Sequence, residues 1–222
     1  MADHMYKLSE VPKGKRMQHF RDYYLFKTII WAIVIISLIS LVKTTVFRTK
    51  PDINVLVATN EFLHPYVWNN LKDEMTNFCI DYNGDKKTVV ELNVNTFDES
   101  TKNNVSQNAG ATQRYMAVLA MADHLIQIVD DERYENLKSQ GLIGTYKDLA
   151  GYDTGKDENE EVKIPLSELE AFDSISKDMM TEHYLTIRTR AGSQLHDKEN
   201  KIENYENHVE VFASLAGFEK IK

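Results

Sequence analysis

The chain has 222 residues, 42% of them hydrophobic and 27% charged, with a single cysteine. This composition supports a domain with a buried core and excludes an intrinsically disordered chain, and one cysteine excludes an internal disulfide. The charge is unevenly divided, because residues 1–50 hold 9 basic and 3 acidic side chains whereas residues 51–222 hold 17 basic and 31 acidic ones. Since so acidic a region repels phosphate backbones, nucleic-acid binding is not an expected function.

A continuous apolar segment, TIIWAIVIISLISLV, occupies residues 28–42 and is bounded by Lys27 and Lys43. A membrane span needs about 20 residues, and lysine stems and flanking aromatic residues extend this segment to residues 24–47. Six basic residues precede the segment and three follow it, which places the N-terminal side in the cytoplasm. The sequence therefore predicts a single-pass cell-membrane protein with a basic cytoplasmic tail at 1–23, a transmembrane helix at 24–47 and an extracellular domain at 48–222.

Two alternatives to a permanent membrane anchor are disfavoured by the same residues. A cleaved secretory signal ends in small residues around its cleavage site, whereas this segment continues as SLVKTTVFRTK, with large and basic side chains in those places. A buried helix of a soluble protein normally has a polar face, but residues 28–42 are apolar on every side. We therefore expect an uncleaved signal anchor.

The first part of the acidic region alternates short apolar runs with amphipathic segments. Strands are expected where apolar residues cluster, at 53–58 (INVLVA), 88–94 (TVVELNV) and 124–129 (HLIQIV). Helices are expected at 63–78, where apolar residues recur every three or four positions, across 115–121, and at the charged segment 130–139. Strands that alternate with helices at this spacing predict parallel βαβ units around a buried sheet, and hence an α/β fold.

The second part of the acidic region is less regular. Residues 150–161 (AGYDTGKDENEE) are rich in glycine and acidic residues and are interpreted as a surface loop, and the pattern from there to residue 182 is ambiguous. Alternating apolar and polar residues predict a half-buried strand at 184–190. Apolar residues at helical spacing predict a final amphipathic helix at 202–215.

Residues 113–149 combine a small-residue-plus-Asp turn at Ala122-Asp123, the strand at 124–129, a helix that leads through Gly141, and a segment that ends in Asp148-Leu149. This segment resembles a recurring part of the extracellular solute-binding proteins of ABC transporters. The order of elements from Ile53 onward is similar to the start of their type II periplasmic-binding-protein fold. As a whole, the chain resembles small N-terminally anchored proteins of Gram-positive bacteria with an ectodomain of this fold.

The resemblance implies a periplasmic-binding-protein-like ectodomain that works beside an ABC transporter or another envelope complex. Solute-binding proteins of this kind have two lobes, which close on a ligand in the crevice between them, and roughly twice the soluble length. Residues 51–222 therefore supply one lobe or a shortened pair of lobes.

A ligand of a parallel sheet binds outside the carboxyl ends of its strands. The loops that follow the three expected strands supply eight candidate ligand-binding residues, namely Thr59, Asn60, Glu61, Asn95, Thr96, Phe97, Asp130 and Asp131. The alternative is that these residues only cap helices and end strands.

A weak metal motif lies at Asp81, Asn83 and Asp85, which match positions 1, 3 and 5 of a calcium-binding loop. The rest of that pattern fails, because Lys86 stands at the sixth position and Leu92 at the twelfth, where glycine and glutamate are needed. A plain Asn-Gly turn is the alternative. GYDTGK at 151–156 is one residue too short for a phosphate-binding loop, and no H-E-x-x-H or G-x-S-x-G motif occurs, so no cofactor and no enzyme activity are predicted.

These features predict a membrane-tethered extracellular binding or interaction domain that resembles a solute-binding protein. Its expected partners are the lipid bilayer, an ABC transporter or other membrane proteins, and a small-molecule or peptide ligand. The alternative is a structural subunit of a membrane protein complex that binds no small molecule.

Overall fold

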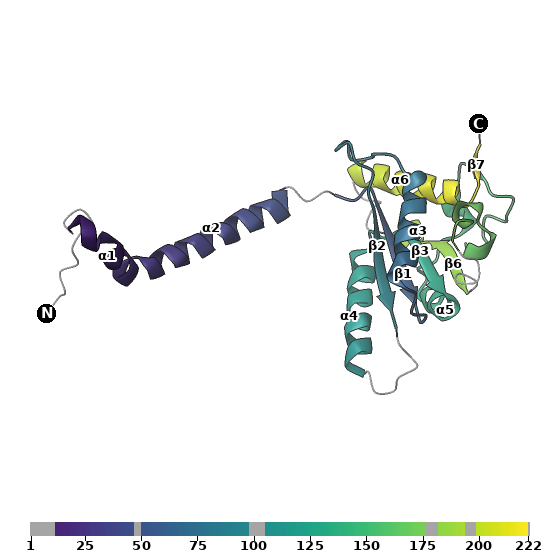
Figure 1. The fold of residues 1–222 in the computed structure, drawn as a ribbon. Helices are drawn as coiled ribbons and strands as arrows, with labels where there is room; N and C mark the ends of the chain where they lie inside the picture. The colour runs from purple at the N-terminus through teal and green to yellow at the C-terminus, as the bar shows by residue number, and fades with distance from the viewer. Residues whose placement is uncertain (1–11, 47–49, 98–104, 176–181, 194–198, 222) are drawn as a thin grey trace. The chain divides into compact units, whose positions relative to one another are not determined.

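The computed structural model describes residues 12–46, 50–97, 105–175, 182–193 and 199–221. Two compact units make up the chain, Met1–Thr49 and Lys50–Lys222 (Figure 1). The first unit is helical, and the second is a mixed α/β domain with one central sheet.

The N-terminal unit consists of the short η1 (Lys13–Lys15), α1 (Arg16–Tyr23) and α2 (Leu25–Val46). The 22 residues of α2 span about 33 Å, which matches a hydrocarbon core of about 30 Å. Within the described part of the chain, the segment Leu25–Lys43 is the one helical stretch long and apolar enough to cross a membrane, and none of it is buried. A membrane anchor and a signal sequence share these properties.

The central sheet of the second unit has the strand order β2-β1-β3-β6-β5. Its strands are β1 (Ile53–Thr59), β2 (Val90–Thr96), β3 (Ile126–Asp130), β5 (Ile164–Pro165) and β6 (His183–Ile187). The three strands expected in the first half of the domain are confirmed, and β1 pairs in parallel with both β2 and β3. Strand β6, which the sequence predicts without a direction, runs antiparallel to both β3 and β5, so the sheet is mixed.

Helices cover both faces of the sheet (Figure 1). They are α3 (Pro65–Asn77), α4 (Val105–Met121), α5 (Asp131–Ser139) and α6 (Glu199–Leu215). Because side chains of a strand alternate between faces, Val55 and Val57 of β1 join the core under α3 and α6, whereas Leu56 joins the core under α4 and α5. All three are 0% exposed, as expected for a central strand buried on both faces.

The region after α5 is built from short pieces. It contains the helical turns η2 (Tyr146–Leu149), η3 (Leu166–Glu168), η4 (Glu170–Phe172) and η6 (Arg190–Gly192), and the strands β4 (Tyr152–Asp153) and β7 (Glu219–Lys220). The expected surface loop at 150–161 thus includes β4, which pairs with β7 near the C-terminus. Leu166, Leu169 and Phe172 from the ambiguous stretch are buried in the same core as β1, so this stretch is part of the domain.

Candidate functional site

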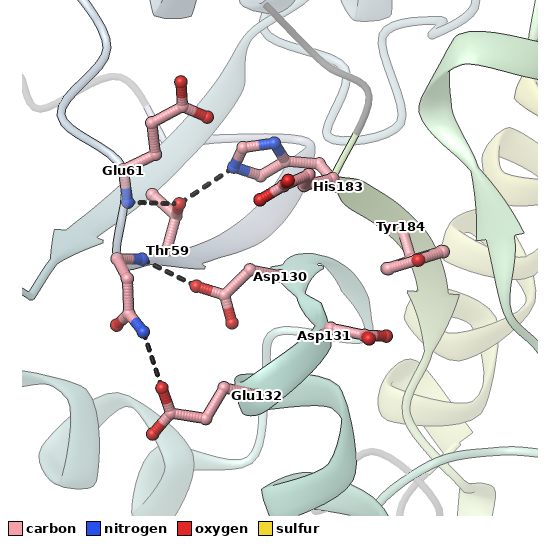
Figure 2. A pocket seen from close by; sticks show the side chains of 9 residues that line it. Thr59, Glu61, Asp130, Asp131, Glu132, His183 and Tyr184 are labelled. Atoms are coloured by element: carbon pink, nitrogen blue, oxygen red, sulfur yellow. Dashed lines mark hydrogen bonds between the residues drawn. The ribbon is translucent and has the colours of Figure 1, made fainter.

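A pocket of about 770 Å³ lies where β1 and β3 end (Figure 2). The strand that follows β1 in the sequence, β2, lies on one side of β1, and the next strand, β3, lies on the other side. The carboxyl ends of β1 and β3 therefore form a topological switch point, which is where ligands of open α/β sheets bind. Among the residues that the structure describes, nine line the pocket, namely Thr59, Asn60, Glu61, Asp130, Asp131, Glu132, Glu182, His183 and Tyr184.

The most buried part of the pocket is formed by Thr59 at the end of β1 and His183 at the start of β6. Their exposed fractions are 0% and 1%, and Oγ1 of Thr59 lies 2.8 Å from Nε2 of His183. The same hydroxyl oxygen accepts a hydrogen bond from the backbone N–H of Glu61 at 3.0 Å. This contact holds the loop after β1 against the first residue of β6.

Asn60 joins the loop after β1 to the start of α5. Its backbone N–H donates to Asp130 Oδ2 at 2.6 Å, and its side-chain Nδ2 donates to Glu132 Oε2 at 2.6 Å (Figure 2). Its side-chain oxygen accepts from Nη2 of Arg133 at 2.7 Å. Every polar group of the Asn60 side chain is therefore engaged by α5, which fixes the width of the pocket on this side.

Asp130 and Asp131 have different surroundings, although they are adjacent. Asp130 is the N-cap of α5 and its Oδ1 accepts from the backbone N–H of Arg133 at 2.8 Å. The exposed Asp131 lies 2.5 Å from Nζ of Lys163, which also sits 4.2 Å from the ring centroid of Tyr184. These contacts connect α5 to β5 and β6 across the mouth of the pocket.

The lining of the pocket is strongly acidic. Five of the nine described residues that line it carry a carboxylate, and none of these nine is Lys or Arg. Burial lowers the pKa of His183, although the nearby carboxylates of Glu61, Asp130 and Glu182 act in the opposite direction. The imidazole is therefore neutral at pH 7 and adds no positive charge to the site.

Five of the eight candidate ligand-binding residues line the pocket: Thr59, Asn60, Glu61, Asp130 and Asp131. The other three are at the end of β2, which lies on the far side of β1 from β3: Asn95 and Thr96 are its last two residues, and Phe97 follows it. Asn95 is 2% exposed and its side chain donates to the backbone oxygen of Asn93, while Thr96 pairs with Thr59 in the β1–β2 ladder. Phe97 packs 5.5 Å from the ring of Tyr115, with the guanidinium of Arg133 4.1 Å above it.

Four lining residues were not predicted from the sequence, namely Glu132, Glu182, His183 and Tyr184. Three of them surround the start of β6, which was expected as a strand at 184–190 without a direction. Because β6 runs antiparallel to β3, its first residue pairs with the last residue of β3, Asp130 with His183. The direction of that strand is the signal that would have identified them.

The weak metal motif forms a turn whose oxygens are used by the backbone. Asp81 accepts from the N–H groups of Gly84 at 2.7 Å and Lys86 at 2.7 Å, and Asp85 accepts from Lys87 at 2.9 Å. Gly84 and Lys86 have φ values of 74° and 68°, as a tight turn requires. Among the residues that the structure describes, no three or more His, Cys, Asp or Glu side chains are grouped to hold a metal ion.

The Thr59–His183 contact has the separation of a nucleophile and its general base. Thr59 is 0% exposed, however, and among the described residues Nδ1 of His183 has no hydrogen-bond partner, whereas a catalytic base is oriented by a third group. The interpretation of the site depends on this chemistry alone, because comparison of the chain with protein-family models, with curated proteins and with solved structures gives no match.

Proposed function

We propose that the chain is a membrane-tethered extracellular binding domain, anchored by α2, whose pocket at the ends of β1 and β3 takes a small-molecule or peptide ligand. It resembles a solute-binding protein and acts as an accessory to an ABC transporter or another envelope complex. The observation that carries the proposal is the position of the pocket, since a polar cavity at a switch point of an α/β sheet is the usual place for a ligand.

The tether supports a role next to a membrane partner. α2 is apolar around its whole circumference and long enough to span a bilayer, and six basic residues precede the apolar segment. Fixing a domain to the membrane raises its effective concentration near proteins of the same membrane. The parallel order β2-β1-β3, with the pocket at the carboxyl ends, is consistent with a single lobe of a solute-binding protein.

Membrane orientation is tested by labelling two cysteine variants with a membrane-impermeant maleimide, in a Cys79→Ala background. Glu135→Cys lies on the exposed surface of α5, and Lys13→Cys lies in the basic tail. On intact cells we expect labelling of the α5 position alone, with the tail position labelled only after permeabilisation. Labelling of the tail on intact cells, or a mature soluble protein that lacks residues 1–50, contradicts the proposal.

Ligand binding is tested by thermal unfolding of the full-length protein in detergent micelles against amino acids, sugars and short peptides. A compound that binds only the native fold raises the melting temperature. We expect at least one class of compound to do so, and we expect Thr59→Val to abolish the shift because it removes the hydroxyl that holds the loop after β1 against His183. If a compound raised the melting temperature of Thr59→Val as much as that of the wild type, the compound would bind outside this pocket.

A structural subunit is the second candidate, because large apolar side chains are exposed on the domain. Phe62 is 82% exposed and Ile80 is 62% exposed, which is typical of protein contact surfaces when such residues cluster. A photo-crosslinking amino acid at Phe62 tests this function in living cells. Capture of an integral membrane protein, together with no thermal shift from any compound, would favour the structural subunit.

A further inference from the structure

The charge balance of the pocket indicates the class of its ligand. Three of the five carboxylates already have partners: Asp130 caps α5, Asp131 pairs with Lys163, and Glu132 lies 3.4 Å from Nη1 of Arg133. These three carboxylates organise the walls of the pocket. Asp131 and Glu132 each face a cation, and Asp130 accepts two backbone hydrogen bonds at the amino end of α5.

The remaining carboxylates, Glu61 and Glu182, have no such partner. Neither side chain forms an ion pair or hydrogen bond with a described residue, and both residues are exposed at the mouth of the pocket. They lie on either side of the buried Thr59–His183 contact, one in the loop after β1 and one just before β6. A pocket that holds two unbalanced negative charges attracts a positive ligand and repels an anionic one.

His183 provides a second, independent indication of a missing ligand. It lines the pocket and is 1% exposed, yet its Nδ1 has no hydrogen-bond partner within the described part of the chain. Buried polar atoms are ordinarily paired, so an unpaired ring nitrogen at a binding pocket calls for an explanation. The hydroxyl of Thr59 can donate to or accept from Nε2, so the tautomer of the imidazole decides whether Nδ1 offers an N–H or a lone pair.

We infer that the pocket binds an organic cation, a ligand with an ammonium or guanidinium group, and that Glu61 and Glu182 supply its counter-charge. This inference rests on the proposed function. A bare metal ion fits less well, since the described residues contain no metal-holding group and the pocket of about 770 Å³ has the size of sites for small organic molecules. The partly exposed Tyr184 lines the same pocket, and its ring would contact the uncharged part of the ligand.

The test uses full-length protein in detergent micelles and titration calorimetry with spermidine and with L-arginine methyl ester. Glucose and citrate are the neutral and anionic probes. We expect both cations to bind and to weaken as sodium chloride is raised, because salt screens exposed charges. In the double variant Glu61→Gln/Glu182→Gln we expect the dissociation constant to rise about tenfold, which corresponds to about 1.4 kcal/mol for the two counter-charges together.

The matched control is Glu170→Gln/Glu219→Gln, which removes the same charge from exposed positions on η4 and β7, and it should bind the cations unchanged. If glucose or citrate binds and Thr59→Val abolishes it, the cation class is overturned while the proposed binding function stands. If Mg²⁺ alone competes fully with spermidine, the ligand is a metal ion and the inference fails. If no compound of the wider panel or of these probes binds, both the inference and the proposed function fail.

Discussion

Residues 50–139 and residues 140–221 contribute side chains to the same hydrophobic core, but their secondary structure differs. In the first region each parallel strand of five or seven residues is followed by a helix that packs on it. In the second region the strands before α6 are short or reversed, and its described residues include four helical turns of three or four residues each. Yet Val162, Leu185 and Phe212 are 0% exposed in the core that also contains β1. Regular alternation is therefore not required for integration into the core, and the second region is held by its contacts with the first.

The largest expected effect tests whether the two regions form one cooperative unit. Phe212 in α6 and Leu71 in α3 are both 0% exposed in one core, so Phe212→Ala should lower the free energy of unfolding by about 3–5 kcal/mol and Leu71→Ala by about 2–5 kcal/mol. Urea denaturation followed by tryptophan fluorescence measures both. A separate early transition in Phe212→Ala would show that the second region unfolds alone.

The next effect concerns a buried histidine that connects the regions. Nε2 of His208 accepts a hydrogen bond from the backbone N–H of Asn54 at 3.2 Å. Burial lowers the pKa of His208 to about 4. The folded protein then binds fewer protons than the unfolded chain between pH 6.5 and about 4, so stability falls as the pH falls through that window, by about 3 kcal/mol for this residue. Denaturation at several pH values measures the slope.

His208→Gln is the matching control, and it should show a smaller loss of stability between pH 6.5 and 4 than the wild type. His183, whose pKa is also lowered, adds a loss of the same sign in both proteins. The lowered pKa of Asp123, which comes mainly from its hydrogen bond with His124, affects stability only below its ordinary value of 3.8. If the loss of stability between pH 6.5 and 4 is as large in His208→Gln as in the wild type, His208 is not the source of that loss.

A smaller effect is expected at the wall of the pocket. Asp130→Ala removes the N-cap of α5 and the acceptor for the backbone N–H of Asn60, so the free energy of unfolding should fall by about 1–2 kcal/mol. Asp131→Ala, next to it, removes only an exposed ion pair and should cost less than about 1 kcal/mol. Equal losses from the two variants would contradict the capping role of Asp130.

The smallest effect concerns the lysine that joins β5 to α5. Nζ of Lys163 lies 2.5 Å from Asp131 and 4.5 Å from the ring centroid of Tyr134, and its side chain is 30% exposed. Lys163→Met should therefore lower stability by less than about 1 kcal/mol, and raised salt should reduce the difference. Lys156→Met, in the exposed loop after β4, should leave stability unchanged. If Lys163→Met lowered the free energy of unfolding by several kcal/mol, the contact between Lys163 and Asp131 would be needed to hold the second region together.

The sequence correctly predicted those strands and helices whose pattern is visible in neighbouring residues. Consecutive branched residues identified β1, and three- or four-residue spacing identified α3 and α6, because burial of a strand or of one helix face is visible in neighbouring residues. The alternation at 184–190 indicated a strand but not its direction, since direction depends on which distant strand it joins. For the same reason Thr59 and Asp130 were found as pocket residues, whereas His183 was not.

The end of β2 shows a second kind of limit. Asn95, Thr96 and Phe97 stand at the carboxyl end of a parallel strand just as Thr59 and Asp130 do, so nothing in their local pattern separates them from the pocket residues. Their place depends on β2 being the outer neighbour of β1, which is a property of strand order. Phe97 still contributes indirectly, because its ring lies under Arg133, which also contacts Asn60.

The central position of β1 has a mechanical consequence. The polypeptide enters the globular unit at Lys50, just before the amino end of β1, and the pocket lies at the carboxyl end of the same strand, about 20 Å away over seven residues. A pull between that point and a bound ligand acts along the strand axis. It loads the parallel ladders to β2 and β3 in shear, so many hydrogen bonds resist together instead of opening one after another.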